Sequence, residues 1–247
     1  MPKKRVSLTL EEKLVERIDS EAEENSVNRS QQVEEILTEY LEGRGLDTAV
    51  VLCGDPENKA MNEYRGRPVI SHVLENLSEQ GISRVFLLAG QNVDELMDEL
   101  GSRFEGMELE YVSEDEPKGT AVALENISDE ISGLFVTVNG HVIADVDIRE
   151  MVEIHRDEDS ISTMALTSVE DPSGYGVAKL KGRKILGFEE KPEGEVFSRL
   201  INAGRYIFDP DIFDRLDENS LEEVFEKLAD NGELSGYIYG GRWKDLD

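Results

Sequence analysis

The chain of 247 residues is long enough for one ordinary domain and a small additional module. Its 33% charged and 38% hydrophobic residues are typical of a globular protein and exclude a disordered one. No apolar run approaches the roughly 20 residues that a membrane span needs, and the N-terminal Met-Pro-Lys-Lys-Arg leads into no apolar signal core. We therefore expect a cytoplasmic protein without a membrane partner. A single cysteine, Cys53, excludes an internal disulfide.

The formal net charge of −29 is spread along the chain and is not gathered in an acidic tail. Such a composition is typical of proteins dissolved at very high salt, where screening removes the repulsion between carboxylates. The charge therefore says more about the solvent than about a partner. It predicts a halophilic protein of haloarchaeal type.

Residues 1–45 differ in pattern from the rest and are predicted to form a separate module. The stretch "KKRVSLTL" alternates, so that Val6, Leu8 and Leu10 point to one side and the polar residues between them to the other. This alternation predicts a strand with one apolar face and one polar face.

Two helices are predicted after this strand. Apolar residues recur at helical spacing over residues 11–24 and again over 29–41, with Ser30 placed to cap the second helix. One strand and two helices over about 40 residues cannot bury a core alone, so two copies are expected to pair strand to strand. The module therefore predicts a homodimer or a higher oligomer.

This pattern resembles the ribbon-helix-helix repressors of the Arc, MetJ and CopG type over the whole module. In that family a two-stranded ribbon enters the major groove of double-stranded DNA, and the start of the second helix lies on a phosphate. The resemblance implies an inverted repeat as the preferred DNA site. The implied DNA-binding residues are Arg5, Ser7 and Thr9 at base edges, Lys4 beside them on the ribbon, and Arg29 and Ser30 near the DNA backbone.

A plain dimerisation module is the alternative interpretation of residues 1–45. This part holds 7 basic and 11 acidic residues, whereas residues 46–247 hold 19 and 44. Three of the module's basic residues gather at positions 3–5 on the ribbon, as a DNA-binding face requires. We favour DNA binding over dimerisation alone.

Residues 46–247 change to alternating strands and helices. This βαβ order predicts an α/β domain whose mostly parallel sheet is covered by helices on both faces. Strands are expected at 48–54, 83–90, 109–115, 134–139 and 161–169, helices at 67–81, 92–104 and 147–159, and shorter strand-rich pieces from residue 175 onward.

Nearly the whole of residues 47–247 resembles the sugar-1-phosphate nucleotidyltransferases. These Rossmann-like enzymes, of the GT-A type, join a nucleoside triphosphate to a sugar phosphate and release pyrophosphate. The resemblance rests on the order and spacing of several motifs. They are "GRP" at 66–68, "GTA" at 119–121, "DPSGYGV" at 171–177, "EKP" at 190–192, "INAGRYIFDPDIF" at 201–213 and "RWKDLD" at 242–247.

The loop after the first strand departs from this family. The family has a glycine-rich loop there whose backbone N–H groups and basic side chains hold the triphosphate. Here the stretch "LCGDPENKAMNEYRGRP" is shorter and keeps only Gly54 of the glycines, and Lys59 matches the family lysine. Asp55 and Glu57 add negative charge where the triphosphate would lie.

The metal position departs as well. The family has an aspartate after Gly140 that binds Mg²⁺, and here His141 stands in its place, while Asp245 matches the second metal aspartate. Magnesium prefers oxygen ligands in octahedral geometry, so an imidazole is a poor replacement. Zinc or manganese accept His with Asp, but two ligands are too few. We therefore predict no metal, no other cofactor and no catalytic residue.

The residues that the resemblance places at the ligand are better kept. Their alternative roles are structural, since the glycines can serve turns and the Glu190–Lys191 pair can lie on the surface. The implied residual ligand-binding residues are Lys59, Gly119 and Thr120 on the nucleotide side, and Gly176, Glu190, Lys191, Asn202 and Gly204 on the sugar side.

The combined prediction is a sequence-specific DNA-binding transcriptional regulator. Its residues 46–247 would form a nucleotidyltransferase-like pseudoenzyme that senses a ligand, with a sugar nucleotide as one candidate, or that serves oligomerisation. An active sugar-1-phosphate nucleotidyltransferase with an added dimerisation module is the second hypothesis. The third is a dimerisation scaffold that binds neither DNA nor ligand.

Overall fold

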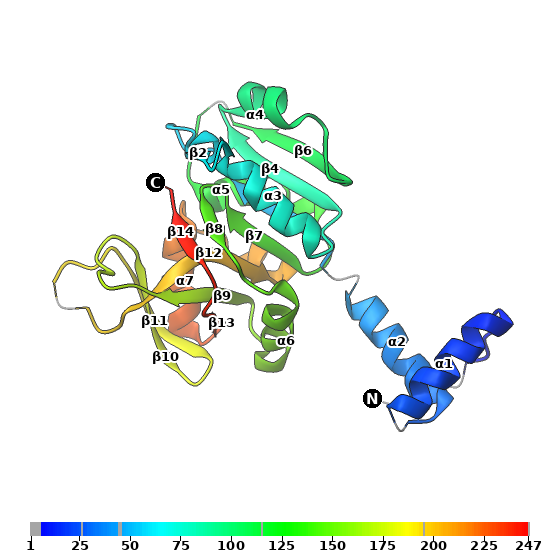
Figure 1. Cartoon of the computed structure of the whole chain (residues 1–247). Coiled ribbons are helices and arrows are strands. Elements are labelled where there is room, and N and C mark those ends of the chain that lie inside the picture. The colour runs from blue at the N-terminus through cyan, green and yellow to red at the C-terminus, as the bar shows by residue number, and fades with distance from the viewer. Residues whose placement is uncertain (1–5, 26, 44–45, 115, 195, 247) are drawn as a thin grey trace. The chain divides into compact units, whose positions relative to one another are not determined.

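The computed structural model describes residues 6–25, 27–43, 46–114, 116–194 and 196–246. The chain divides into two compact units, Met1–Gly45 and Leu46–Asp247 (Figure 1). Each unit is described by itself below.

The smaller unit contains two helices, α1 (Glu12–Glu24) and α2 (Arg29–Gly43). They are the two helices expected from the sequence. The guanidinium of Arg29 joins them through two hydrogen bonds to the Asp19 carboxylate, of 2.5 and 2.6 Å. This contact holds the pKa of Asp19 below its usual value. The start of α2 is thereby tied to the middle of α1.

Asn28, and not Ser30 as expected, caps the second helix. The backbone N–H of Gln31 donates to Asn28 Oδ1, and the backbone N–H of Asn28 donates to Gln31 Oε1, both at 3.1 Å. These reciprocal bonds form a capping box. Ser30 was the wrong choice because the box starts the helix at Arg29, which places Ser30 inside its first turn.

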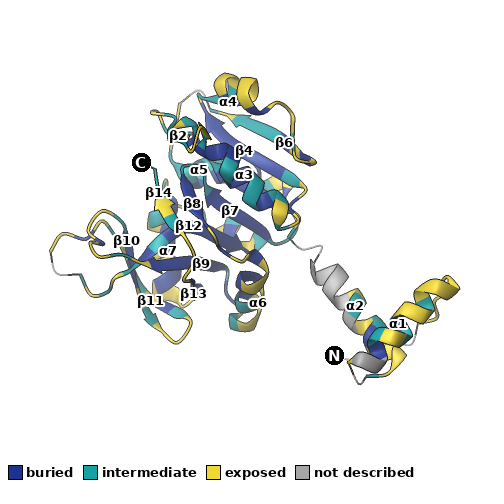
Figure 2. Ribbon diagram, in the orientation of Figure 1, coloured by how far each residue is buried: buried dark blue, intermediate teal, exposed yellow. Residues whose placement is uncertain are grey.

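Residues 6–10 form no strand in the single chain, contrary to the expectation for this stretch. Val6, Leu8 and Leu10 are 71%, 57% and 39% exposed, and most of α1 is exposed as well (Figure 2). A ribbon needs a second strand for its hydrogen bonds, and one chain does not supply it. The described apolar side chains buried in this unit are Ile18 and Ala22.

The larger unit is built on a ten-stranded sheet (Figure 1). Its strand order is β10-β11-β13-β9-β12-β7-β1-β4-β6-β5. In that order the strands are Gly176–Lys181, Lys184–Glu190, Leu234–Ile238, Ser162–Ser168, Leu200–Phe208, Phe135–Asn139, Thr48–Leu52, Arg84–Gly90, Met107–Ser113 and Arg103–Phe104. The unit also contains two separate two-stranded sheets. One pairs β8 (Val142–Ala144) with β14 (Trp243–Asp245), and the other pairs β2 (Glu63–Tyr64) with β3 (Arg67–Pro68).

The Rossmann-type α/β fold expected for this unit is confirmed. Strands β7, β1, β4 and β6 run parallel to one another, and so do β9 and β13. Strand β12 is antiparallel to both of its neighbours, β7 and β9, and the outer pairings are antiparallel too. The sheet is therefore mixed and not mostly parallel as expected, because β12 and the outer strands run antiparallel to their neighbours, and the parallel ladder is concentrated around β1.

Helices cover both faces of this sheet. One core contains residues of α3 (Val69–Glu79), α4 (Val93–Leu100) and α6 (Ile148–Glu158), and the other contains residues of α5 (Thr120–Glu125) and α7 (Leu221–Asn231). Strand β1 contributes to both, because Ala49 and Val51 lie in the first core and Val50 in the second. This two-sided burial explains its continuous apolar sequence.

Three short 3-10 helices lie between these elements, η1 (Lys59–Met61), η2 (Ser128–Glu130) and η3 (Pro210–Arg215). None of the helices in the described part of the chain combines the length and apolar character that crossing a membrane requires.

Candidate ligand site

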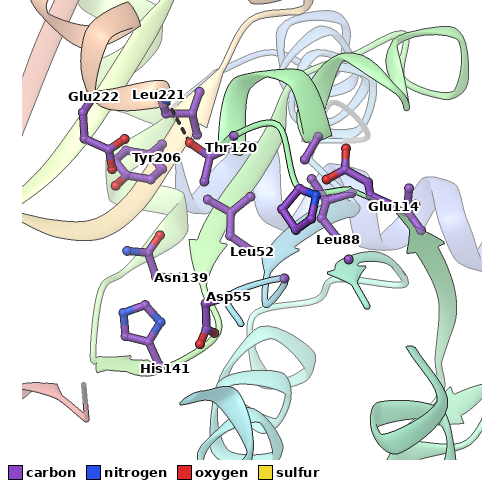
Figure 3. Close-up of a pocket in the computed structure, with 16 residues that line it drawn as sticks. Leu52, Asp55, Leu88, Glu114, Thr120, Asn139, His141, Tyr206, Leu221 and Glu222 are labelled. Atoms are coloured by element: carbon purple, nitrogen blue, oxygen red, sulfur yellow. Dashed lines mark hydrogen bonds between the residues drawn. The ribbon is translucent and has the colours of Figure 1, made fainter. Parts of the chain in front are cut away.

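A cavity of about 240 Å³, called the first cavity below, opens at the carboxyl ends of the parallel strands (Figure 3). This edge of an α/β sheet is where ligands usually bind. The first cavity is lined by Leu52, Gly54, Asp55, Leu88, Gly90, Val112, Glu114, Pro117, Gly119, Thr120, Ala123, Asn139, His141, Tyr206, Leu221 and Glu222.

The loop after β1 is held by hydrogen bonds from Asn92 and by contacts among its own residues. Asn92 Nδ2 donates to the carbonyl oxygens of Cys53 (3.0 Å) and Asp55 (2.8 Å). The Asp55 carboxylate accepts the backbone N–H of Lys59 at 3.1 and 3.2 Å, and Lys59 Nζ lies 3.6 Å from Glu57 Oε2. An aspartate and a glutamate therefore engage the backbone and side chain of the lysine that was expected to meet a phosphate.

His141 and Asp245 come together at the edge of the first cavity. The pairing of β8 with β14 brings them within reach, with His141 Nε2 3.8 Å from Asp245 Oδ1, and both side chains are partly buried. Within the described ranges, no group of three His, Cys, Asp or Glu side chains is arranged to hold a metal ion. A cation at this place would meet one imidazole and one carboxylate.

Gly119 and Thr120 both line the first cavity, as expected for the nucleotide side. Each also has a structural role. Gly119 has φ +119°, and a Cβ there would lie 2.1 Å from the carbonyl oxygen of Asn219. Thr120 Oγ1 accepts the backbone N–H of Leu221 at 2.9 Å, the dashed contact in Figure 3. These two residues thus attach the start of α5 to the start of α7.

Asn202 and Gly204 lie behind the wall of the first cavity and hold two of its lining residues. Asn202 Nδ2 donates to the Tyr206 hydroxyl at 2.7 Å, and Asn202 Oδ1 accepts the backbone N–H of Gly204 at 2.9 Å. Gly204 has φ +72°, and a Cβ there would lie 2.9 Å from Asn139 Nδ2. Asn202 and Gly204 therefore position Tyr206 and Asn139, which line the first cavity.

Glu190 lies close to the acidic end of this cavity. Its pKa is raised, first by burial and then by the negative charge of Glu222, which lines the cavity. Lys191 Nζ lies 3.9 Å from Glu190 Oε1. At Gly176 a Cβ would come within 2.7 Å of Glu190 Oε2 and closer still to the Phe188 ring, so glycine there makes room for both side chains.

The charge of the first cavity is negative. Asp55, Glu114 and Glu222 line it, together with His141 (Figure 3). No lysine or arginine is found among the described residues of its wall. Glu114 precedes the "GTA" motif by a few residues, and that position could have drawn attention to it. Tyr206 lies inside the motif at 201–213 but was not singled out there, and Glu222 carried no comparable signal in the sequence.

The DNA-binding residues expected in the smaller unit are only partly visible. Lys4 and Arg5 lie outside the described residues. Ser7, Thr9 and Ser30 are exposed, and the Arg29 guanidinium is bound to Asp19. The structure therefore leaves the DNA-binding role of all six residues as a prediction.

Comparison with known proteins agrees with the fold. Residues 52–246 match the family model described as nucleotidyl transferase, and residues 4–43 match that of the ribbon-helix-helix protein, copG family. The mannose-1-phosphate guanylyltransferase catalytic subunit beta of Drosophila pseudoobscura pseudoobscura is 34% identical over 197 residues, 76% of this chain and 53% of that protein. A related protein of Arabidopsis thaliana, described as a probable mannose-1-phosphate guanylyltransferase, is 30% identical over 200 residues, with 76% and 60% covered.

Solved structures show the same fold. A protein from Bacillus anthracis, described as a putative glucose-1-phosphate thymidylyltransferase and bound to a sucrose, superimposes with a TM-score of 0.73 at 26% identity, over 81% of this chain and 89% of that one. A UDP-glucose pyrophosphorylase complexed with UDP-glucose gives a TM-score of 0.70 at 21% identity, over 81% and 92%, which supports the fold alone.

Fold and cavity define a nucleotidyltransferase-type α/β domain preceded by a ribbon-helix-helix module. The chain belongs to the nucleotidyl transferase family, and its first residues to the copG family of ribbon-helix-helix proteins. It spans about half the length of the curated relatives it matches, with 53% of the Drosophila pseudoobscura pseudoobscura protein covered.

Proposed function

We propose that the protein is a dimeric, sequence-specific transcriptional regulator whose residues 46–247 bind a ligand without transferring a nucleotide. The observation that carries the second half is the charge of the first cavity, where Asp55, Glu114 and Glu222 line the wall. A triphosphate carries several negative charges and needs backbone N–H groups, basic side chains or Mg²⁺ to neutralise them. Carboxylates in this place repel it.

The contacts of Lys59 in the loop after β1 support the same proposal. The backbone N–H of Lys59 already donates to Asp55, and the lysine ammonium lies near Glu57. At the metal position, His141 with Asp245 offers a single carboxylate. The domain thus keeps the walls of a nucleotide site while its charges oppose the reaction. Sensing of a small sugar or nucleoside ligand is the use that remains for the cavity.

The ribbon-helix-helix module supports the first half of the proposal. Two chains would form a two-stranded ribbon that presents Arg5, Ser7 and Thr9 twice, so the preferred DNA site is an inverted repeat. We also infer that the protein works in a salt-rich cytoplasm. There counterion release contributes little to affinity, and base contacts must contribute most of it.

DNA binding is tested by mapping the protein on chromosomal DNA and then comparing two variants on the recovered site. Arg5→Ala should weaken binding to that site by about 10-fold or more while changing binding to random DNA much less, because one good base contact is worth about 1–3 kcal/mol. Ser30→Ala should weaken both equally, because a phosphate contact carries no sequence information. Full affinity of Arg5→Ala for the recovered site would contradict sequence reading by the ribbon.

An active sugar-1-phosphate nucleotidyltransferase is the second candidate function, favoured by the 34% identity to a mannose-1-phosphate guanylyltransferase. The two candidate functions are distinguished by measuring pyrophosphate release from GTP and mannose 1-phosphate with Mg²⁺ at high KCl. We expect no release above background. Turnover that Asp245→Ala abolishes, and that the surface control Asp217→Ala keeps, would overturn the pseudoenzyme proposal. His141→Asp alone should not create activity, because the loop remains acidic.

A further inference from the structure

A second cavity of about 170 Å³ lies beside the first, on the other side of strand β12. Side chains alternate along a strand, and this alternation separates the two: Tyr206 lines the first cavity and its neighbour Arg205 lines the second. Residues of β2, α3 and β8 form the remaining walls of the second cavity. Three arginines reach it, Arg65, Arg205 and Arg242.

Arg205 is the unusual residue of this cavity. It is 1% exposed, and its Nε and Nη1 atoms are buried without a hydrogen-bond partner. The hydroxyl of Tyr239, which interacts electrostatically with Arg205, is also buried without one. Burial lowers the pKa of Arg205 to about 10, so the guanidinium still carries its charge at neutral pH. A buried cation with unmade hydrogen bonds is costly unless something compensates it.

The carboxylates that line the same cavity do not provide this compensation. Asp145 accepts a hydrogen bond of 3.0 Å from Arg242, and although it attracts the Arg205 charge, no hydrogen bond joins the two. Glu75 is bound to Arg67 on the protein surface, at 2.9 Å between Oε2 and Nη2. Glu79 is exposed and lies at the rim. Arg205 therefore lines this cavity and carries two buried donors that none of the cavity's carboxylates accepts.

We propose that the second cavity binds a small oxyanion, with Arg205 as its buried anchor and Arg65 and Arg242 at the entrance. A guanidinium offers several N–H donors, and the oxygens of a tetrahedral anion accept such donors in charge-assisted hydrogen bonds. Inorganic phosphate and the phosphate group of a small metabolite share this chemistry. This site is separate from the first cavity, so the proposal does not depend on whether the first cavity is catalytic.

The test is a calorimetric titration of potassium phosphate into the full chain at constant ionic strength. Wild-type protein should show one saturable site. Arg205→Met keeps the volume of the side chain and removes the donors, and it should weaken phosphate binding by about 10-fold or more, the range expected for hydrogen bonds to a charged group. Arg215→Met is the matched control. Arg215 is a partly exposed arginine paired with Glu233 at 3.1 Å, and its loss should leave the affinity unchanged.

Two results would overturn the proposal. One is the absence of saturable phosphate binding to the wild-type chain, which needs no variant and would mean that water alone fills the cavity. The other is unchanged affinity in Arg205→Met, or in Arg205→Gln if the methionine variant does not fold. A parallel titration with a hexose 1-phosphate distinguishes the two sources of the anion. If the affinity for the sugar phosphate is unchanged in the Arg205 variant, that binding is assigned to the first cavity. If the variant loses this affinity, the result supports the second cavity.

Discussion

The two units of the chain differ in how completely they bury their apolar side chains. Of the nine large apolar side chains that are exposed among the described residues, five lie in the first 45 residues, namely Val6, Leu8, Leu10, Leu14 and Leu37. The larger unit encloses two cores, one on each face of its sheet. The larger unit thus buries its core within one chain, whereas the smaller unit leaves apolar residues exposed, as we expect of a module that pairs with a second copy.

This difference predicts a change of assembly when the smaller unit is removed, the largest effect expected here. A chain starting at Leu46 should stay folded and show half the mass of the full-length dimer by light scattering. In the full chain, unfolding of the smaller unit should move to higher temperature as protein concentration rises, because association stabilises it. Leu8→Asp should mimic the truncation, and Leu186→Asp, at an exposed leucine of the larger unit, should not. Dimers that persist without residues 1–45 would contradict the assignment of dimerisation to the smaller unit.

Gly119→Ala should destabilise the larger unit alone, by about 3 kcal/mol. The added methyl would meet the carbonyl of Asn219, and alanine resists the φ of +119°. The measurement is denaturant unfolding followed separately for the two units. Gly174→Ala is the control, because nothing lies within 4 Å of its added Cβ. Equal stabilities for the two variants would mean that α5 and α7 are not held together here.

Acid should destabilise the larger unit through His155, which is buried and has Nδ1 2.9 Å from Thr163 Oγ1. Burial lowers the pKa of His155 to about 4, so its contribution to stability is complete above pH 6.5 and is lost as the pH falls toward 4. Between pH 7 and pH 4.5 this loss is about 2–3 kcal/mol. His155→Gln should remove that part of the pH dependence. All three histidines lie in the larger unit, so the smaller one should show none of it.

Loss of a helix cap should have a similar small effect in both units, about 1 kcal/mol each. Asn28→Ala removes the cap of α2, and Ser220→Ala removes the oxygen that accepts the backbone N–H of Glu223 in α7. The two should differ in how they are observed. The Asn28→Ala effect should appear in the unfolding transition of the smaller unit, which depends on protein concentration. The Ser220→Ala effect should appear in the unfolding transition of the larger unit. Thermal unfolding at two protein concentrations separates them, and a Ser220→Ala effect that varied with concentration would contradict this assignment.

Much of the fold could be predicted from local sequence patterns, and the differences at helix ends have local causes. The helix expected over 67–81 runs from Val69 to Glu79, because Arg67 and Pro68 form a strand before it and Gln80 ends it. The helix expected over 92–104 ends at Leu100, because Gly101 adopts φ +69° and the next residues pair with β6. The antiparallel direction of β12 could not be predicted, since it depends on partners far away in the sequence.

The motifs predicted only some of the residues that line the first cavity, because the other residues expected at the ligand do not line it, namely Lys59, Gly176, Glu190, Lys191, Asn202 and Gly204. Gly119, Thr120 and His141 were expected there and do line the first cavity. Tyr206 and Glu222 were missed, because only the folded sheet brings β12 and the start of α7 to the same cavity. For the same reason the buried donors of Arg205 could not be foreseen, since a sequence does not show which side chains lack an acceptor.

The only tryptophan of the chain lies on β14, next in sequence to a residue that lines the second cavity. Trp243 lies on β14, with Arg242 of the second cavity before it and Asp245, the neighbour of His141, two residues after it. Its indole N–H donates to the carbonyl of Ala203 at 3.3 Å, and its ring meets Tyr175 edge to face at 5.3 Å. Indole emission responds to the polarity of its surroundings, so this strand supplies an intrinsic fluorophore. We therefore expect binding in the second cavity, which Arg242 lines, to change the tryptophan emission, so that it can be followed without a label attached to the protein.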